Sequence, residues 1–412
     1  TAYYGAGNAT LAIVGDIDIK ETKEKVQRWF GEIRRGPDVE TPTSQPVTLD
    51  ASKSLYFEDN FAKLPELRIT FPSVEAYNED EQALDVLARL IAGTKNSPLY
   101  REIVETQQLA PDVSAYNSSM ELAGEFVFRV RANAGTDLDD VKAALDEALA
   151  DFEANGVDET DLQRIKAEQE TILYNNLATV LGKANQMASD NEFAGDPAYS
   201  VHQAELLREV TAEDVMAAYE TYIKDKPAIL TSFVPEGEVD LALDGSEQAS
   251  VWIEEVKSDV ASEEVSQGEE AEYEKTPSQY DRSEPEFGEL PLVEMPNVWE
   301  AELDHGTVLL GIENDELPLV SFDIVFDTGS WEDEPGLEGT ASLLAAMLNE
   351  GTATKTAAEL EQAIGLLGSG ISVSADIDSI TISATSLARN FEATVALIEE
   401  MLTQPRWDEA YF

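Results

Sequence analysis

Apolar and polar residues alternate along several short stretches in the first half of the chain. The clearest is residues 125–131, where Phe126, Phe128 and Val130 alternate with polar neighbours. A period of two predicts a half-buried antiparallel strand. Strands are also expected at residues 9–17, 55–58, 67–74, 113–116 and 228–234.

Between these strands the apolar spacing is helical. A long helix is expected at residues 158–187 with Asp158 as its N-cap, and Thr211 with Asp214 resembles a capping box that opens a helix reaching Ile223. Further helices are expected at residues 21–33, 79–92, 97–106 and 137–154. The predicted buried stripe of the long helix is Ile165, Ile172, Leu173, Leu177, Val180 and Leu181.

The last part of the chain shows a second series of elements. Residues 298–309 predict a hairpin that turns at Asp304–Gly306. In the helix expected from Gly339 to Gly351, the C-cap is Gly351 and the inner face is Leu343, Leu344, Met347 and Leu348. The remaining predictions are strands at 320–326, 370–374 and 380–384, and helices at 357–367 and 390–402.

The stretch from about residue 235 to 297 is rich in Glu, Asp, Ser and Pro and has little periodicity, which indicates an acidic linker. We therefore expect three parts: residues 1–235, a linker at 236–297, and residues 298–412. Helices mixed with antiparallel strands predict an α+β fold, in which two-layer domains of mostly antiparallel sheet are backed by helices.

Composition limits the possible partners. The 412 residues include 83 acidic and 27 basic side chains, a net charge of -56, with 43% apolar residues. Such a charge repels phosphates and anionic lipid, so nucleic acid is excluded as a partner. The simplest interpretation is an acidic surface that is solvated in a salty or extracellular setting. A cation-binding role is the weaker alternative.

Candidate chemistry in the side chains is sparse. There are no cysteines, which excludes disulfides and thiolate metal sites, and no apolar run is long enough to span a membrane. The two histidines, His202 and His305, lie about a hundred residues apart. Each is expected to be an ordinary surface or core residue.

Three segments in order carry a family resemblance. The opening Tyr3-Tyr4 with Val14-Gly15-Asp16, the hairpin with its Asp304-His305-Gly306 turn, and the helix from Gly339 to Thr352 resemble segments of the pitrilysin/insulinase family of zinc peptidases. In that family, the helix that corresponds to the third segment carries the inverted zinc motif H-x-x-E-H. The resemblance places the two zinc-binding histidines at Ser342 and Ala346 and the water-activating glutamate at Ala345.

A second family feature is also missing. Active members hold the substrate carbonyl with an arginine and, seven residues later, a tyrosine. The resemblance places these at Val104 and Pro111. We therefore predict no catalytic, cofactor-binding or metal-binding residue in this chain, and the third zinc ligand, a more distant glutamate, is also absent.

The resemblance implies that residues 1–235 form a second, non-catalytic domain and residues 298–412 the first part of a third. The leading hypothesis is a fragment of a periplasmic or envelope-located zinc endopeptidase that degrades unfolded peptides in a closed chamber. Its zinc ligands are expected upstream of Thr1, and its partners are the peptide substrate and the remaining domains of the same protein. The alternative is a non-catalytic structural or partner-binding member of the family. The sequence gives no oligomeric state.

Overall fold

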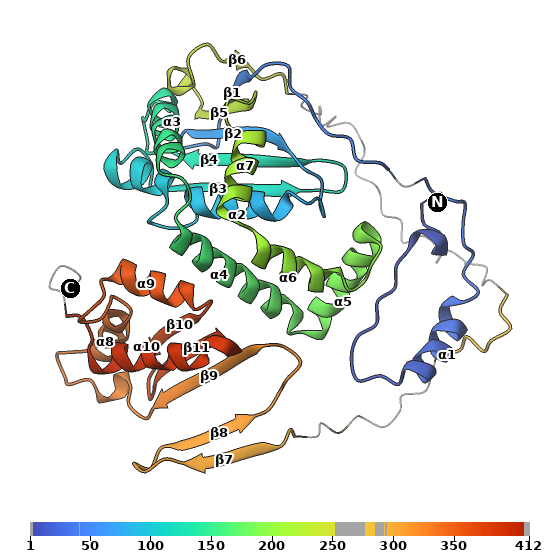
Figure 1. The fold of residues 1–412 in the computed structure, drawn as a ribbon, viewed down its shortest axis with the longest axis vertical. Helices are drawn as coiled ribbons and strands as arrows, with labels where there is room; N and C mark the ends of the chain where they lie inside the picture. Colours follow the sequence, from blue (N-terminus) through green and yellow to red (C-terminus); the bar gives the residue numbers. More distant parts are fainter. Residues whose placement is uncertain (1–2, 41, 252–276, 285–291, 293–294, 408–412) are drawn as a thin grey trace, which may run out of the picture. The chain divides into compact units, whose positions relative to one another are not determined.

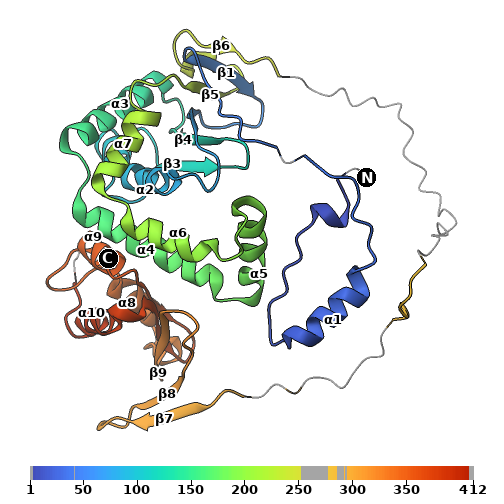
Figure 2. The ribbon, with the colours of Figure 1, turned by 45° about the vertical axis from the view of Figure 1, so that its right-hand side comes forward.

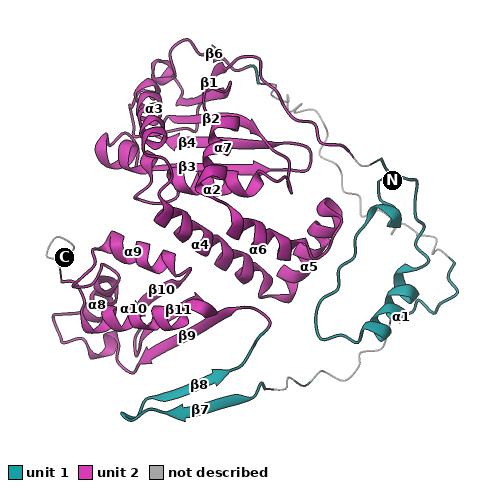
Figure 3. Cartoon of the chain, in the orientation of Figure 1, with its two compact units in different colours: residues 1–41, 250–315 teal, residues 42–249, 316–412 magenta. Residues whose placement is uncertain are grey.

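A computed structural model describes residues 3–40, 42–251, 277–284, 292 and 295–407 (Figure 1). The chain divides into two compact units, residues 1–41 with 250–315, and residues 42–249 with 316–412 (Figure 3). No helix among these described residues is long and apolar enough to cross a membrane.

The second unit contains a six-stranded sheet in the order β3-β4-β2-β5-β1-β6. Its neighbours from β3 to β5 are antiparallel, whereas β1 runs parallel to β5 and β6. The strands are β1 (Lys53–Asp59), β2 (Glu66–Ser73), β3 (Asp112–Ser119), β4 (Gly124–Arg131), β5 (Ile229–Pro235) and β6 (Glu247–Gln248). Of the six strands predicted in the first half of the chain, all but the one at residues 9–17 are thus confirmed.

Helices back this sheet and enclose the larger core. In β2, Leu67 and Ile69 alternate with half-buried residues and pack against the helices. The helices are α2 (Glu81–Ala92), the π-helical turn η2 (Tyr100–Thr106), α3 (Leu138–Asn155), α4 (Glu159–Leu177), α5 (Val180–Ser189), η3 (Asp190–Ala194), α6 (Tyr199–Glu209) and α7 (Ala212–Tyr222).

The predicted N-terminal caps are confirmed. The Asp158 carboxylate accepts a hydrogen bond from the N–H of Asp161 at 2.9 Å, so α4 begins where expected. Thr211 and Asp214 form the reciprocal capping box of α7.

The single long helix predicted to Met187 is wrong. Helix α4 ends at Leu177, and Thr179 caps a new helix by accepting the N–H of Gly182 at 2.9 Å. Of the predicted stripe only Ile165 is buried. Ile172 is exposed on α4, where Glu170 and Thr171 are buried instead, and Val180 and Leu181 are exposed in the first turn of the new helix.

The same unit contains a smaller three-stranded antiparallel sheet in the order β10-β11-β9. Its elements are β9 (Leu319–Phe326), α8 (Thr340–Leu348), α9 (Ala357–Leu366), β10 (Gly370–Ala375), β11 (Ile380–Leu387) and α10 (Phe391–Thr403). They follow the order predicted from the sequence and enclose a second core. Helix α9 packs against α4, side by side in both views (Figures 1 and 2).

Two details of α8 differ from the prediction. Its C-cap is Asn349, and Gly351 (φ +120°) instead forms a β-bridge with Thr356. Leu343 is exposed, whereas Ala341, Ala345 and Leu348 belong to the core. Ala341, Ala345 and Leu348 follow one another at spacings of four and three and so share the inner face of α8, and Leu343 lies off that face.

The first unit holds helix α1 (Ile19–Phe30) and the hairpin of β7 (Val298–Glu302) and β8 (Val308–Ile312), whose predicted turn is confirmed. The strand predicted at residues 9–17 does not form. It has no ladder partner among the described residues, and an extended segment becomes a strand only by pairing.

Within the described part of the chain, no strand shows extensive contact with helix α1. Its Trp29 lies beside the guanidinium groups of Arg28 and Arg282, at 5.4 and 5.8 Å from the ring centre, and the Trp29 carbonyl accepts a hydrogen bond from Arg282. A described piece of the predicted linker therefore contacts α1 at Trp29, whereas Ile19 and Phe30 of the helix are exposed.

The start of the predicted linker packs on the larger sheet, where Ala242 and Leu243 are buried. Residues 252–276, 285–291 and 293–294 of that linker lie outside the described residues. The α+β fold, with mostly antiparallel sheets backed by helices, is confirmed.

Candidate functional site

Helix α8 carries the positions where the resemblance places the zinc motif. Gly339 precedes the helix with a left-handed φ of +99°, which glycine adopts without steric cost. The Asp333 carboxylate accepts the N–H groups of Gly339 and Ala341 at 2.7 and 3.0 Å. These bonds satisfy backbone donors that the first helical turn leaves open, so the helix is formed by local chemistry without a metal.

Ser342 and Ala346 lie one turn apart on the exposed side of α8, whereas Ala345 is buried. The backbone thus has the spacing with which two side chains can share a metal ion. A catalytic zinc needs about three nitrogen, oxygen or sulfur ligands, and these positions offer one hydroxyl. Among the described residues no group of three or more His, Asp or Glu side chains could hold a metal. The residues at α8 therefore do not fit zinc.

The positions of the carbonyl-binding pair lie around η2. Val104 is half-buried within this turn and packs against the larger core, and Pro111 is exposed just before β3. Neither side chain has a hydrogen-bond donor. This segment therefore cannot polarise a peptide carbonyl through these two residues.

The two histidines also lie in ordinary settings. His202 is exposed on α6, with its Nδ1 3.7 Å from a carboxylate oxygen of Glu205 and its ring against Tyr199. His305 lies in the exposed turn between β7 and β8. Their roles stay predictions.

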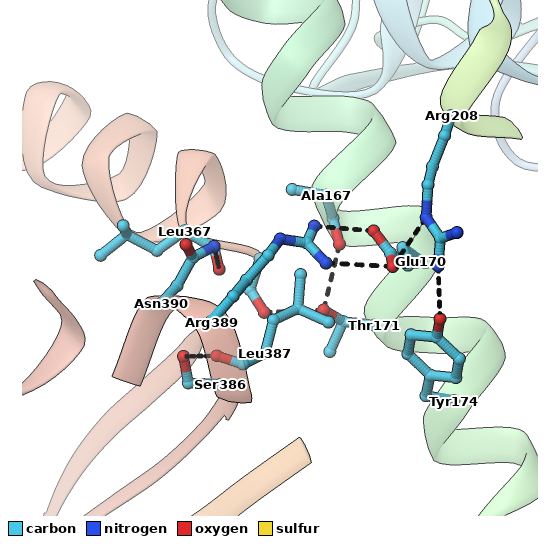
Figure 4. A network of polar contacts seen from close by, with 11 residues as sticks. Ala167, Glu170, Thr171, Tyr174, Arg208, Leu367, Ser386, Leu387, Arg389 and Asn390 are labelled. Carbon is cyan, nitrogen blue, oxygen red and sulfur yellow. Dashed lines mark hydrogen bonds and ion pairs between the residues drawn. The ribbon is translucent and has the colours of Figure 1, made fainter. Parts of the chain in front are cut away.

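The main polar cluster of the second unit is one that the sequence reasoning missed. We call it the Glu170 joint, formed by Glu170, Thr171, Arg208, Gly368 and Arg389. Figure 4 shows Glu170 between the two arginines. The Glu170 carboxylate is only 3% exposed. It accepts two hydrogen bonds from Arg389, at 2.7 and 3.1 Å, and two from Arg208, at 2.9 and 3.2 Å.

The joint links the two sheets of the unit. Glu170 and Thr171 lie on α4, Arg208 on α6, and Arg389 follows β11. The Thr171 hydroxyl donates to the Gly368 carbonyl at 2.7 Å, across nearly two hundred residues of sequence. Buried charges are stable when they are paired and hydrogen-bonded, and this carboxylate is both.

Burial raises the pKa of Glu170, but the hydrogen bonds and charges of Arg389 and Arg208 outweigh it and hold the pKa below its usual value. Both carboxylate oxygens are occupied by guanidinium donors, so the group cannot readily accept a proton from a substrate. The arrangement is suited to holding elements together rather than to acid–base chemistry.

In a second cluster the pKa values of the carboxyl groups are raised rather than lowered. At the start of α2, burial raises the pKa of Glu81 to about 7, with a smaller contribution from the charge of Asp85 and against the lowering effect of the hydrogen bond from the Tyr77 N–H. Burial likewise raises the pKa of Asp85 to about 6. The Glu81 carboxylate accepts the N–H of Tyr77 at 2.7 Å, and Tyr77 has a left-handed φ of +65°.

Only one signal in the sequence pointed to the Glu170 joint. Ala167, Glu170 and Thr171 share one face of α4, at i, i+3 and i+4, and this face lies away from Ile165 and the stripe predicted from it. Its partners Arg208 and Arg389 are distant in sequence, and no local pattern connects them.

Two sequence profiles of one peptidase family match the chain. The profile of the peptidase M16 inactive domain matches residues 1–169, and that of insulinase (peptidase family M16) matches residues 310–412. Together they cover both ends of the chain in the order expected from the resemblance.

Two curated relatives are zinc proteases. PqqE of Helicobacter pylori is 21% identical over 228 residues, which are 54% of this chain and 50% of the relative. YmxG of Bacillus subtilis is 22% identical over 196 residues, which are 47% of this chain and 46% of the relative. The chain thus spans about half the length of the curated relatives it matches.

Solved structures give fold-level likenesses. A protease from Helicobacter pylori has a TM-score of 0.49 at 19% identity, with 54% of each chain covered. The periplasmic protease PqqL from Escherichia coli has a TM-score of 0.47 at 14% identity, covering 96% of this chain and 45% of that one. The two profiles agree on the assignment: the chain belongs to peptidase family M16, with residues 1–169 corresponding to its inactive domain.

Proposed function

We propose that this chain is the non-catalytic part of a zinc-dependent endopeptidase, in which it forms wall and hinge of a chamber that admits short unfolded peptides. The observation that carries the proposal is an intact α8 with no metal ligand at Ser342, Ala345 or Ala346, within a family whose relatives are zinc proteases. The Glu170 joint supports a structural role, because it holds α4 and the smaller sheet together.

In this proposal residues 1–235 are a second domain, 236–297 the linker and 298–412 the start of a third domain. The zinc and its ligands belong to a part of the parent protein upstream of Thr1, where zinc would activate the attacking water. The location would be periplasmic or in the cell envelope, and the remaining domains and an unfolded peptide would be the partners.

The proposal predicts that the 412-residue chain neither binds zinc tightly nor cleaves peptides. Calorimetric titration with zinc and a quenched-fluorescent peptide assay measure both properties. Stoichiometric tight binding together with chelator-sensitive cleavage by the unmodified chain would contradict the proposal.

Restored ligands give a sharper test. Ser342→His with Ala346→His places two imidazoles on the exposed side of α8, and we expect weak zinc binding and no turnover. Adding Ala345→Glu should destabilise the fold, because Ala345 is buried and a carboxylate there would be desolvated. Turnover by the triple variant would show that this helix is a catalytic site that had lost only its ligands.

The alternative is a non-catalytic partner-binding subunit, favoured by the match of residues 1–169 to the inactive domain. The sequence of the parent protein separates the two. An H-x-x-E-H motif upstream of Thr1 would support the peptidase, and a parent without any such motif would support the subunit.

A further inference from the structure

The larger sheet carries a pocket on the face that points away from its core. The pocket is lined by side chains of β2, β4, β5 and the loop between β1 and β2, among them Phe61, Lys63, Glu66, Arg129, Arg131 and Phe233. Glu66 lies directly across the ladder from Arg131 on one side and from Phe233 on the other. These three side chains therefore share one face of the sheet, whereas their neighbours Leu67 and Val130 are fully buried on the other.

A single carboxylate holds both guanidinium groups of the pocket. Arg129 donates to the two oxygens of Glu66 at 2.8 and 2.9 Å, and Nε–H of Arg131 donates to one of them at 3.1 Å. Burial raises the pKa of Glu66, but the hydrogen bonds and charges of the two arginines outweigh it and keep the group ionised. Each guanidinium group has five N–H donors. Both arginines therefore keep donors for a further acceptor, and their side chains are 44% and 58% exposed.

The pocket is positively charged in a chain that is strongly acidic. Its lining has three positive charges, from Lys63 and the two arginines, against two negative charges, from Asp59 and Glu66. Asp112 lies across the ladder from Arg131 but does not line the pocket. The whole chain, by contrast, has 83 acidic and 27 basic side chains. The pocket thus favours an anion where most of the surface repels one.

Aromatic rings form the apolar side of the pocket. Phe61 is 85% exposed, and its N–H donates to the Asp59 carboxylate at 2.8 Å, which fixes the loop that carries the ring. Phe233 is 36% exposed, and its ring meets Phe57 edge-on with the ring centres 6.1 Å apart. Covering such aromatic surface with an apolar group is favourable. A fitting ligand therefore carries an apolar group next to its anionic group.

We propose that this pocket binds the C-terminal residue of a peptide, with its α-carboxylate bonded to Arg129 and Arg131. The side chain of that residue is apolar and packs against Phe61 and Phe233. A carboxylate matches the fork of donors that a guanidinium group presents. At a peptide C-terminus the carboxylate and the side chain are attached to the same Cα atom, which brings the anionic and apolar groups together as the pocket requires. This inference rests on the proposed function in taking a peptide as the ligand, and it adds the end by which the peptide is held.

Fluorescence anisotropy with the 412-residue chain tests the proposal. The first probe is a short peptide with uncharged side chains, a neutral dye at its N-terminus and a C-terminal leucine with a free carboxylate. The second is the same peptide with an amidated C-terminus, and the third is amidated and contains an internal glutamate. At moderate salt, which screens long-range repulsion, we expect saturable binding of the first probe and at least about tenfold weaker binding of the other two.

Variants of the pocket identify the groups that bind. Arg131→Gln should weaken binding of the free peptide at least about tenfold and leave the amidated peptide unchanged, while Glu66 keeps its two hydrogen bonds from Arg129. Phe61→Ser should reduce the preference for a leucine over a glycine at the C-terminus. The matched control is Arg101→Gln, which removes the same charge from an exposed side chain outside the pocket and should bind like the unmodified chain. Circular dichroism verifies that the variants fold.

Four outcomes would overturn the proposal: no saturable binding, equal binding of the free and amidated peptides, equally tight binding of the internal glutamate, or unchanged binding by Arg131→Gln. The zinc titration and the cleavage assay test the proposed function separately. Zinc binding or cleavage by the chain would contradict that function without changing the expected preference for a free C-terminus, so the two failures are distinguishable.

Discussion

Glu170 is a buried carboxylate whose charge is balanced by two arginines from different elements. Replacing it with glutamine removes the charge and leaves both guanidinium groups without a counter-ion. Because hydrogen bonds to charged groups contribute more than neutral ones, we expect Glu170→Gln to lower the free energy of unfolding by about 2–3 kcal/mol at pH 7. Denaturant unfolding measures the change.

The pH dependence identifies the cause of that loss. The folded pKa of Glu170 is lowered, so its stabilisation is present above the ordinary pKa of a glutamate and is lost as pH falls through the folded pKa. The variant and the unmodified chain should converge in acid. Glu209→Gln, at an exposed position next to Arg208, is the control and should change little. A constant difference at all pH values would indicate a packing effect instead.

Glu81 contributes a pH dependence of stability opposite in sign to that of Glu170. Its folded pKa of about 7 lies above the unfolded value of 4.5, so the folded state keeps a proton that the unfolded chain releases. Stability therefore falls as pH rises from about 4.5 to 7. Glu81→Gln stays neutral and can still accept the N–H of Tyr77. We expect it to be about 1–2 kcal/mol more stable than the unmodified chain at pH 8 and similar at pH 4.5.

Thermal unfolding at both pH values measures this effect, with Glu79→Gln at a nearby exposed position as the control. Equal destabilisation of Glu81→Gln at both pH values would show that the carboxylate is needed for its hydrogen bond rather than disfavoured by its charge.

At the scale of elements, glycine permits the contact between α4 and α9. A Cβ atom on Gly365 would lie 2.4 Å from a carboxylate oxygen of Glu168 and 2.8 Å from Cγ of Arg164. The Arg164 head is held by ion pairs to Asp161 and Glu168, so its side chain cannot easily move away. Gly365→Ala gains about 1 kcal/mol of helix propensity but overpacks the contact.

We expect a net loss of about 1–2 kcal/mol for Gly365→Ala in denaturant unfolding. Glu361→Ala, at an exposed position of the same helix, tests propensity without the collision and should be neutral or stabilising. A stabilised Gly365→Ala would mean that α4 and α9 adjust freely.

Elements with local signals were predictable from the sequence. The alternation in β4 and the capping residues Asp158 and Thr211 act over a few residues, and they predicted strands and helix starts correctly. The prediction of a strand at residues 9–17 was wrong, because strand pairing depends on a partner that the local pattern does not specify. Asp158 and Thr179 both cap helices, yet the continuous apolar spacing hid the break between α4 and α5.

The candidate site was predictable only as a set of substitutions. The resemblance identified Ser342, Ala345 and Ala346 as the relevant positions. That Ala345 is buried and that Ser342 and Ala346 are exposed became apparent only from the packing of the helix in the structure. The Glu170 joint depends on arginines brought together by tertiary structure, and the only local signal for it was the alignment of Glu170 and Thr171 with Ala167 on one face of α4.

At the scale of the molecule, charge is the dominant property. With 83 acidic and 27 basic side chains, like-charge repulsion should weaken the fold at low ionic strength, since the screening length grows from about 10 Å at 0.1 M to about 30 Å at 0.01 M. We expect the thermal midpoint to rise with added sodium chloride. A midpoint that is flat or falls between low and moderate salt would indicate that the acidic residues are spaced well enough to have little effect.

The raised pKa of Glu81 has a consequence for handling the protein. The Glu81 carboxyl group is most fully protonated at pH values well below its pKa of about 7, towards the isoelectric point of about 4.1. Near that pH the molecule loses the net charge that keeps copies apart in solution. The conditions that favour this part of the fold are thus those in which the protein precipitates most readily, so a buffer chosen for solubility leaves Glu81 ionised in its buried position.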